Sequence, residues 1–292
     1  MIKTRLRSIS VLLSATTFTL IGLLAAPTVA ATGPATVGLG TAAPFAVLAG
    51  TPKVASTGLT VINGNLGISP AAAVTGFPPG IVKGTIHKAD AIALQAQSDL
   101  TVAYTNAAGR PKTATHGTLG GLTLAPGVYN AGGVVLGLTG TLTLDGHNNS
   151  SAVWIFQATS ALVTASSSRV RLINGASSCN VFWQVTSSAT LGSGSTFVGT
   201  IMALTSITVN SGVTIHGRAL ARNGKVTLID DTITSNTCFH AGSGSGLPAT
   251  DTLAPTNDSA PQPSAALFFG GLFVAFLLVV VARRSRMTAR AR

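Results

Sequence analysis

The feature that most constrains the fold is a short repeat in the second half of the chain. Segments beginning at Thr186, Thr205 and Asn223 align in steps of 19 and 18 residues, and each contains an apolar-Thr-apolar triplet. Glycines at positions 192, 194 and 212 separate the apolar runs, where turns are expected. A period of this length, built from short strand-like runs, is typical of a solenoid in which each repeat forms one coil.

The alternation within each triplet predicts which side chains face outward. Apolar residues face the core and the intervening Thr faces solvent, and neighbouring coils are expected to stack at about 4.8 Å. Two outward columns follow from the alignment, one with Thr141 or Thr143 followed by Thr190, Thr208 and Thr227, the other with Thr196 and Thr214. A β-sandwich is the alternative fold, because its turns also recur at short intervals. The match in register favours the solenoid.

Residues 86–108 have a different pattern. They contain neither Pro nor Gly, and Ile92, Ala96, Ala103 and Ala107 recur at near-helical spacing before Gly109 and Pro111. The spacing predicts one long helix over about residues 87–108, with an apolar stripe that packs against the rest of the fold.

The two ends of the chain hold much of its formal charge of +11. Basic residues at positions 3, 5 and 7 precede an apolar run and the small residues before Ala31. This pattern predicts a secretory signal over residues 1–31, cleaved after Ala30 or Ala31, with an N-terminal membrane anchor as the alternative. Residues 265–282 are predicted to form a transmembrane helix. The basic tail at 283–292 would lie in the cytoplasm and the body outside the cell.

Residues 241–264 are predicted to form a linker rich in Gly, Ser and Pro. Within it, Leu247-Pro248-Ala249-Thr250-Asp251 resembles a sortase sorting signal, with Asp where the usual pattern has Gly. Two modes of attachment therefore stay open, a membrane anchor and covalent attachment to the cell wall.

The composition of the body argues against an enzyme. Residues 32–246 hold ten Lys and Arg against five Asp, and the whole chain has no Glu. Glycoside hydrolysis needs two placed carboxylates, and Asp230 and Asp231 are adjacent, so on a strand they would face opposite ways. No His pairs with Cys or Asp at the spacing of metal ligands, and no basic run indicates nucleic-acid binding. No cofactor is expected.

The chain has two cysteines, Cys179 and Cys238. In an exported protein, one such pair predicts a disulfide, which would tie the end of the body to its middle. Two buried free thiols are the alternative.

Several segments resemble one known family: LGTAAPFAVLAG at 39–50, INGNLGISP at 62–70, DLTVAY at 99–104, LAPGVY at 124–129, VFWQV at 181–185, GSTFVGTIMA at 194–203 and GRALARNGKVTLIDDTI at 217–233. They are similar to the bacterial and fungal ice-binding proteins of the domain of unknown function 3494 type. The resemblance implies a discontinuous right-handed β-helix of triangular section over residues 32–240, with a long helix packed alongside. It also implies that one flat face adsorbs to ice.

The resemblance also suggests which residues contact ice. The family often shows Thr-Ala/Gly-x-Thr/Asn on that face, and three tetrads match it in part, starting at Thr164, Ser193 and Ser211. We therefore expect an ice-binding face that contains Thr164, Ser193, Thr196, Ser211 and Thr214. The alternative is the column of Thr143, Thr190, Thr208 and Thr227.

The sequence thus predicts a surface-tethered ice-binding protein acting in antifreeze, recrystallisation inhibition or ice adhesion. A second reading is a non-enzymatic adhesin or glycan-binding module, and a solenoid enzyme is a third. A glycan binder usually exposes aromatic side chains, whereas Trp154 and Trp183 lie among apolar residues and are expected to be buried.

Overall fold

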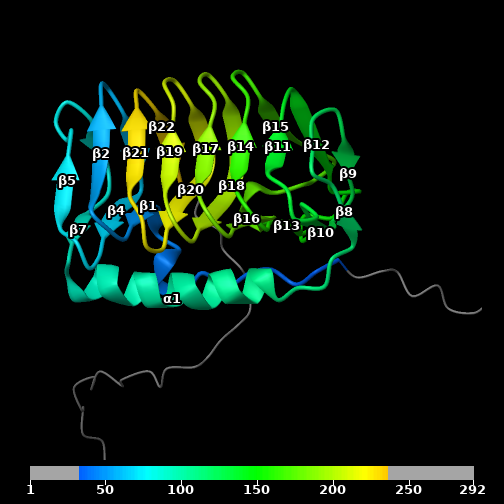
Figure 1. Ribbon diagram of the computed structural model, residues 1–292, viewed down its shortest axis with the longest axis horizontal. Helices are drawn as coiled ribbons and strands as arrows, with labels where there is room; N and C mark the ends of the chain where they lie inside the picture. Colours follow the sequence, from blue (N-terminus) through cyan, green and yellow to red (C-terminus); the bar gives the residue numbers. More distant parts are fainter. Residues whose placement is uncertain (1–32, 236–292) are drawn as a thin grey trace, which may run out of the picture. The chain divides into compact units, whose positions relative to one another are not determined.

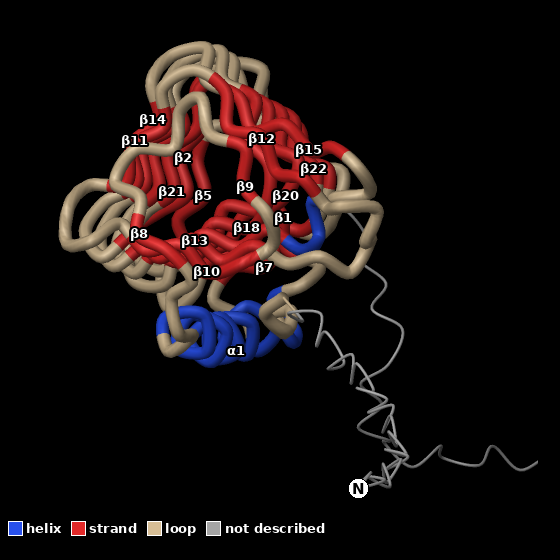
Figure 2. The backbone as a smooth tube through the Cα atoms, turned by 90° about the vertical axis from the view of Figure 1, so that its right-hand side faces the viewer, coloured by secondary structure: helices blue, strands red, loops and turns tan. Residues whose placement is uncertain are grey.

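The computed structural model describes residues 33–235, which form a stack of parallel strands and one long helix. Seen along the stack, the coils have a triangular outline, with strands on three sides and α1 (Ala91–Ala108) against one of them (Figure 2). All strand pairs are parallel, joined by the turns of successive coils. The predicted mostly-β solenoid with one helix alongside is therefore confirmed, and the sandwich is excluded.

Three faces make up the stack. The helix face lies against α1 and contains, in order, β8 (Ala114–Thr115), β10 (Gly127–Asn130), β13 (Trp154–Ala158), β16 (Val181–Val185), the second halves of β18 (Thr196–Ala203) and β20 (Thr214–Ala221), β1 (Phe45–Ala49), β4 (Asn65–Ile68) and β7 (Ile86–Lys88). The seven-stranded face contains β11 (Leu136–Leu138), β14 (Leu162–Thr164), β17 (Ala189–Leu191), β19 (Ile207–Val209), β21 (Val226–Ile229), β2 (Lys53–Thr57) and β5 (Ala73–Thr75). The third face contains β9 (Thr123–Leu124), β12 (Thr141–Asp145), β15 (Arg169–Ile173), the first halves of β18 and β20, β22 (Thr232–Thr234), β3 (Val61–Asn63) and β6 (Ile81–Val82).

The order of coils in space differs from their order in the chain. Strands β1 to β7 form one end of the stack, and α1 then runs along it toward the other end (Figure 1). From β8 onward the chain coils back, until β20, β21 and β22 pair with β1, β2 and β3. The solenoid is therefore discontinuous, and the last coil closes against the first.

Helix α1 begins later than the sequence pattern predicts. Residues Ile86–Lys88 pair with β4 as strand β7, so they are not helical. Asp90 caps the helix, since its Oδ1 accepts the amide of Ala93 at 2.8 Å. The apolar stripe of the helix, which includes Ala96, Leu100 and Ala103, is buried with side chains of the helix face. At the other end, the Gln157 amide donates to the carbonyls of residues 107, 108 and 110.

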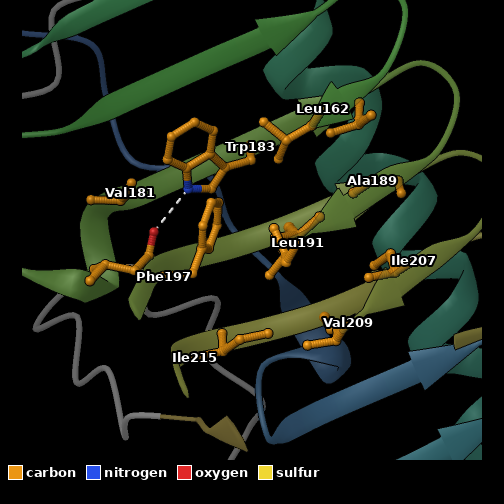
Figure 3. Packing of buried hydrophobic residues seen from close by; sticks show 14 of the residues in the cluster. Leu162, Val181, Trp183, Ala189, Leu191, Phe197, Ile207, Val209 and Ile215 are labelled. Carbon is orange, nitrogen blue, oxygen red and sulfur yellow. Dashed lines mark hydrogen bonds between the residues drawn. The ribbon is translucent and has the colours of Figure 1, made fainter. Parts of the chain in front are cut away.

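An aromatic stack runs through the core from coil to coil. Tyr129, Phe156, Trp183 and Phe197 follow one another with ring centroids 5.6, 4.1 and 4.8 Å apart. The indole nitrogen of Trp183 donates to the carbonyl of Val198 at 2.9 Å, as Figure 3 shows, with the inward Leu, Val and Ile side chains of neighbouring coils around it. Trp154 and Trp183 are both fully buried, as predicted. This dense packing holds the coils at fixed spacing.

Several predictions fall on residues outside the described range. They are the signal at 1–31, the linker, the apolar segment at 265–282, the basic tail, the sorting motif at Leu247–Asp251 and the cysteine Cys238. These stay predictions. Within residues 33–235, α1 is not apolar enough to be a membrane-spanning helix.

Candidate functional site

The three faces differ in what covers them. The outer side of the helix face packs against α1 and against η1 (Gly40–Ala42), and all five residues of β1, β13 and β16 are buried. Within residues 33–235, the two strand faces open to a large ligand are therefore the seven-stranded face and the third face.

On the seven-stranded face, one row of small side chains runs across all seven strands. The row consists of the register partners Gly137, Val163, Thr190, Thr208, Thr227, Ala55 and Thr75. In β14, β17, β19 and β21 the residues on either side of the row point into the core. The row, which we call the central row, thus faces outward along the whole stack without a charged member.

The geometry of these strands keeps the central row straight. Strands β11, β14, β17 and β19 have three residues each, so each of these coils presents one outward position between two inward side chains. Parallel pairing sets successive members of the central row about 4.8 Å apart. Thr and Val are stiff at χ1, because both carry two heavy atoms on Cβ, and so the outward groups keep a fixed orientation.

Charge lies at the borders of the seven-stranded face, with lysines at one border and Asp230 at the corner where β21 ends. Lys225 precedes β21, and the pairing of Val226 with Val54 places it beside Lys53. Both lysines are exposed. Along the same border, the small residues Ser206 and Ser188 continue the edge toward β17. The uncharged area therefore lies between β11 and β21 and continues along the central row into β2 and β5.

The third face is more polar and carries charge in its middle. Thr196 and Thr214 are register partners, as the sequence predicts, and Thr232 continues their row. On the other side, however, the partner of Thr196 is the exposed Arg169. A second exposed arginine lies on the same strand, since Arg171 is the partner of Thr143. Arginine side chains thus interrupt the small residues of this face at two positions of β15.

The structure separates the residues of the first predicted ice face. Thr164 is buried, 3% exposed, and its Oγ1 accepts the amide of Gly192 at 2.9 Å. It therefore cannot contact a surface ligand, and its place in the predicted site was wrong. Ser193 and Ser211 are exposed in the turns between the seven-stranded face and the third face. Only Thr196 and Thr214 lie on a strand face, and that is the third face.

The alternative column is largely confirmed as a column but has one wrong member. Thr190, Thr208 and Thr227 follow one another in register on the seven-stranded face. Thr143 belongs instead to β12 on the third face, where it pairs with Arg171. The alignment by triplets could not distinguish the two faces, since β12 and β17 share the same pattern.

Four members of the central row were missed by the sequence analysis: Gly137, Val163, Ala55 and Thr75. None of them is the Thr of an apolar-Thr-apolar triplet, because Thr75, the one Thr among them, is followed by Gly. The segment Leu136–Leu138 did show a usable signal, namely a small residue between two leucines. Ala55 and Thr75 come from coils far away in the sequence.

The five aspartates of the described residues all accept backbone amides. Asp90 caps α1, Asp99 accepts from Thr41, and Asp145 accepts from His147. Each of these bonds is the largest cause that holds the pKa of the carboxyl below its ordinary value of 3.8. Asp230 accepts from Leu59, and Asp231 from Val213 and Ile229. Within residues 33–235, no group of three His, Cys or Asp could hold a metal ion.

Asp231 differs from the others in its environment. It is 1% exposed, and burial raises the pKa of its carboxyl to about 7, against the opposing effect of two backbone hydrogen bonds. Its neighbour Asp230 adds to the rise by charge repulsion.

Comparison with known proteins finds ice-binding proteins as relatives of this chain. The ice-binding-like family model matches residues 47–234. The ice-binding protein of Nostoc sp. (strain HG1) is 50% identical over 204 residues, covering 69% of this chain and 74% of the relative. That of Flavobacterium frigoris (strain PS1) is 36% identical over 214 residues, covering 68% and 76%.

Solved structures agree in fold. An ice-binding protein from an Antarctic biological consortium is 45% identical with a TM-score of 0.68, covering 70% of this chain and 92% of that one. The ice-binding protein of the Antarctic ascomycete Antarctomyces psychrotrophicus is 41% identical with a TM-score of 0.67, covering 70% and 100%. The stack of coils, the helix beside it and the residues matched across nearly all of the described range place this chain in the ice-binding-like family.

Proposed function

We propose that this chain binds ice, and that it does so through the seven-stranded face. The observation that carries the choice of face is the central row, with seven outward positions in register and no charge among them. The similarity to ice-binding proteins at up to 50% identity supports the function itself.

The chemistry of the ligand fits this face. Ice is a large, uncharged and repetitive surface, so that many weak contacts must act at the same time. Thr190, Thr208 and Thr227 each offer one hydroxyl and one methyl group at a fixed spacing. A charged side chain in the middle of the array would keep its own hydration shell and hold the surface away from the lattice. Arg169 has this position on the third face, which is why we favour the seven-stranded face.

A glycan-binding module finds less support. Such sites usually stack aromatic side chains against sugar rings, but Trp154 and Trp183 are fully buried. The large hydrophobic side chains exposed within residues 33–235 are all aliphatic. An enzymatic role is also less supported, because each aspartate of the described residues is engaged in backbone hydrogen bonds.

We further infer that the protein is exported and held at the cell surface. The signal-like residues 1–31, the linker and the apolar segment 265–282 support this arrangement, and the Leu247–Asp251 motif leaves sortase attachment as a second mode. Protease added to intact cells should release the body. Loss of the body only after permeabilisation would contradict the orientation.

The test of the function is ice recrystallisation inhibition by the purified chain, combined with a matched pair of variants. Thr208→Tyr places a bulky ring on the central row, whereas Thr214→Tyr places the same ring on the third face. Both side chains are half-buried and face outward from their strands. The free energy of unfolding should therefore change by only about 0.5 kcal/mol.

We expect Thr208→Tyr to lose most of the activity and Thr214→Tyr to keep it. The reverse result would assign ice binding to the third face. An inactive wild-type chain would contradict the proposed function.

A further inference from the structure

The seven-stranded face is assembled from two distant parts of the chain. Five of its strands come from residues 136–229, and the other two, β2 and β5, come from residues 53–75. The junction is the pair β21–β2, where Thr227 is the partner of Ala55 and Ile229 is the partner of Thr57. We call this junction the seam. It joins residues that are some 170 positions apart, and so no short turn fixes its register.

Asp230 ties the seam at the corner where β21 ends. Its amide donates to the carbonyl of Thr57 at 3.0 Å, and its Oδ1 accepts the amide of Leu59 at 2.6 Å. The intervening Gly58 has φ +77°, and a Cβ there would lie 1.9 Å from Asp230 Oδ1. The fit between these two segments therefore depends on a glycine on one side and a carboxylate on the other.

Asp231 extends the same tie to the neighbouring coil. Its Oδ1 accepts the amide of Val213 at 2.9 Å, and its Oδ2 accepts the amide of Ile229 at 2.7 Å. Its own amide donates to Thr60 Oγ1 at 3.3 Å, while its carbonyl accepts the amide of Val61 at 2.7 Å. The two aspartates thus connect three consecutive corners along one border of the seven-stranded face.

Elsewhere along this border, the corners are tied by smaller groups. Ser195 Oγ donates to the carbonyls of Gly192 and Ala165 at 2.6 and 3.1 Å, and Thr164 Oγ1 accepts the amide of Gly192. Those corners belong to coils that follow one another directly in the chain. Carboxylates, which form stronger hydrogen bonds than hydroxyls, are found at the corner that adjoins the seam.

We propose that Asp230 and Asp231 are positioning residues for the ice-binding face, because they hold β2 in register with β21 and so continue the central row into Ala55 and Thr75. This role rests on the proposed function. It assigns to the two aspartates no contact with ice, since Asp231 is buried and Asp230 lies in the corner beyond β21.

The test uses the exposed member of the pair, because Asp231→Ala would leave two buried amides without an acceptor and could prevent folding. Asp230→Ala removes the acceptor for Leu59. Asp230→Asn keeps an acceptor oxygen, and Asn tolerates the left-handed backbone at this position, where φ is +53°. Asp145→Ala is the control, since Asp145 accepts the amide of His147 in a similar way but lies on β12, away from the face.

Two readouts on the purified full chain separate positioning from general stability: amide hydrogen exchange and ice recrystallisation inhibition well below the melting temperature. In Asp230→Ala, exchange at Val54–Thr57 should accelerate about tenfold while that of β17 stays unchanged, and the concentration needed for inhibition should rise severalfold. Asp230→Asn and Asp145→Ala should behave like wild type in both.

Unchanged exchange at Val54–Thr57 in Asp230→Ala would show that Asp230 does not hold β2 against β21. Faster exchange with full ice activity would overturn the positioning role. The ice activity of the wild-type chain is measured separately. If the wild-type chain lacks ice activity, the proposed function fails, and the positioning role fails with it.

Discussion

Thr208 lies directly opposite Thr227 on neighbouring parallel strands, and these two residues are separated in the sequence by one coil. Thr190 stands on the other side of Thr208 in the same register. Three identical outward groups in sequence-adjacent coils give the face its fixed spacing. What limits this uncharged area on the side of β21 is Lys225, two residues before Thr227.

Replacement of Lys225 by Thr should therefore enlarge the ice-binding area. Lys225 is exposed beside Lys53, so the substitution removes one charge and relieves repulsion between two like charges without disturbing the core. We expect the concentration needed for ice recrystallisation inhibition to fall by about twofold, as one more weak contact acts with the others. Lys112→Thr, a change of the same charge near the end of α1, is the control. Equal effects of both substitutions would show that net charge, and not the position, is responsible.

Thr164→Val should lower stability without a specific effect on ice binding. The hydroxyl of this buried residue accepts the amide of Gly192, and its loss leaves a buried donor without a partner, at a cost of about 1–3 kcal/mol. Denaturant unfolding measures the change. Ice activity per folded molecule should equal that of wild type, because Thr164 is not on the surface. A selective loss of ice activity would mean that this residue does contact ice.

The disulfide between Cys179 and Cys238 stays a prediction, since Cys238 lies outside the described residues. Cys179 lies in η2 (Ser178–Asn180), beside the third face. Mass spectrometry of the unreduced exported protein should show one cross-linked peptide. Its reduction should cost about 3–5 kcal/mol of unfolding free energy, because the closed loop is long. Two alkylatable thiols in the native protein would contradict the pairing.

The sequence alone predicted the architecture well because each coil repeats the same local physics. The alternation in Ile207–Val209 and Val226–Ile229 sets which side chains are buried, and the 18-residue step sets which strands are neighbours. The same alternation, applied to Leu162–Thr164, would have placed Thr164 inward with Leu162. The family motif pointed the other way, and the structure agrees with the alternation.

The seam and the interruptions on the third face could not be predicted in this way. The pairing of Thr227 with Ala55 joins two ends of the fold and follows no sequence period. Arg169 stands next to Thr196 although 27 residues separate them, because the coil between them is lengthened by the loop that holds η2. The 18-residue alignment therefore passed over the arginine that interrupts the first predicted ice face.

The stability of the chain should depend on pH through the carboxyl of Asp231. Burial raises the pKa of Asp231 to about 7, from an ordinary value of 3.8. Between these two values the folded chain holds a proton that the unfolded chain has released. The free energy of unfolding should therefore fall as the pH rises through this window, with the stabilisation complete at its acidic end and lost at its upper end.

Three other carboxyls, those of Asp90, Asp99 and Asp145, have lowered pKa values. Their contribution to the free energy of unfolding depends on pH in the opposite direction, and it changes below the ordinary pKa of 3.8. Measurements between about pH 5 and pH 8 therefore lie outside the range of these three groups, and the change caused by Asp231 should be on the order of 2 kcal/mol. Asp231→Asn should remove this slope, because the amide does not titrate, whereas Asp145→Asn should keep it. If the slope persists unchanged in Asp231→Asn, another group must titrate in this range, and the buried carboxyl of Asp231 must already be ionised at pH 5.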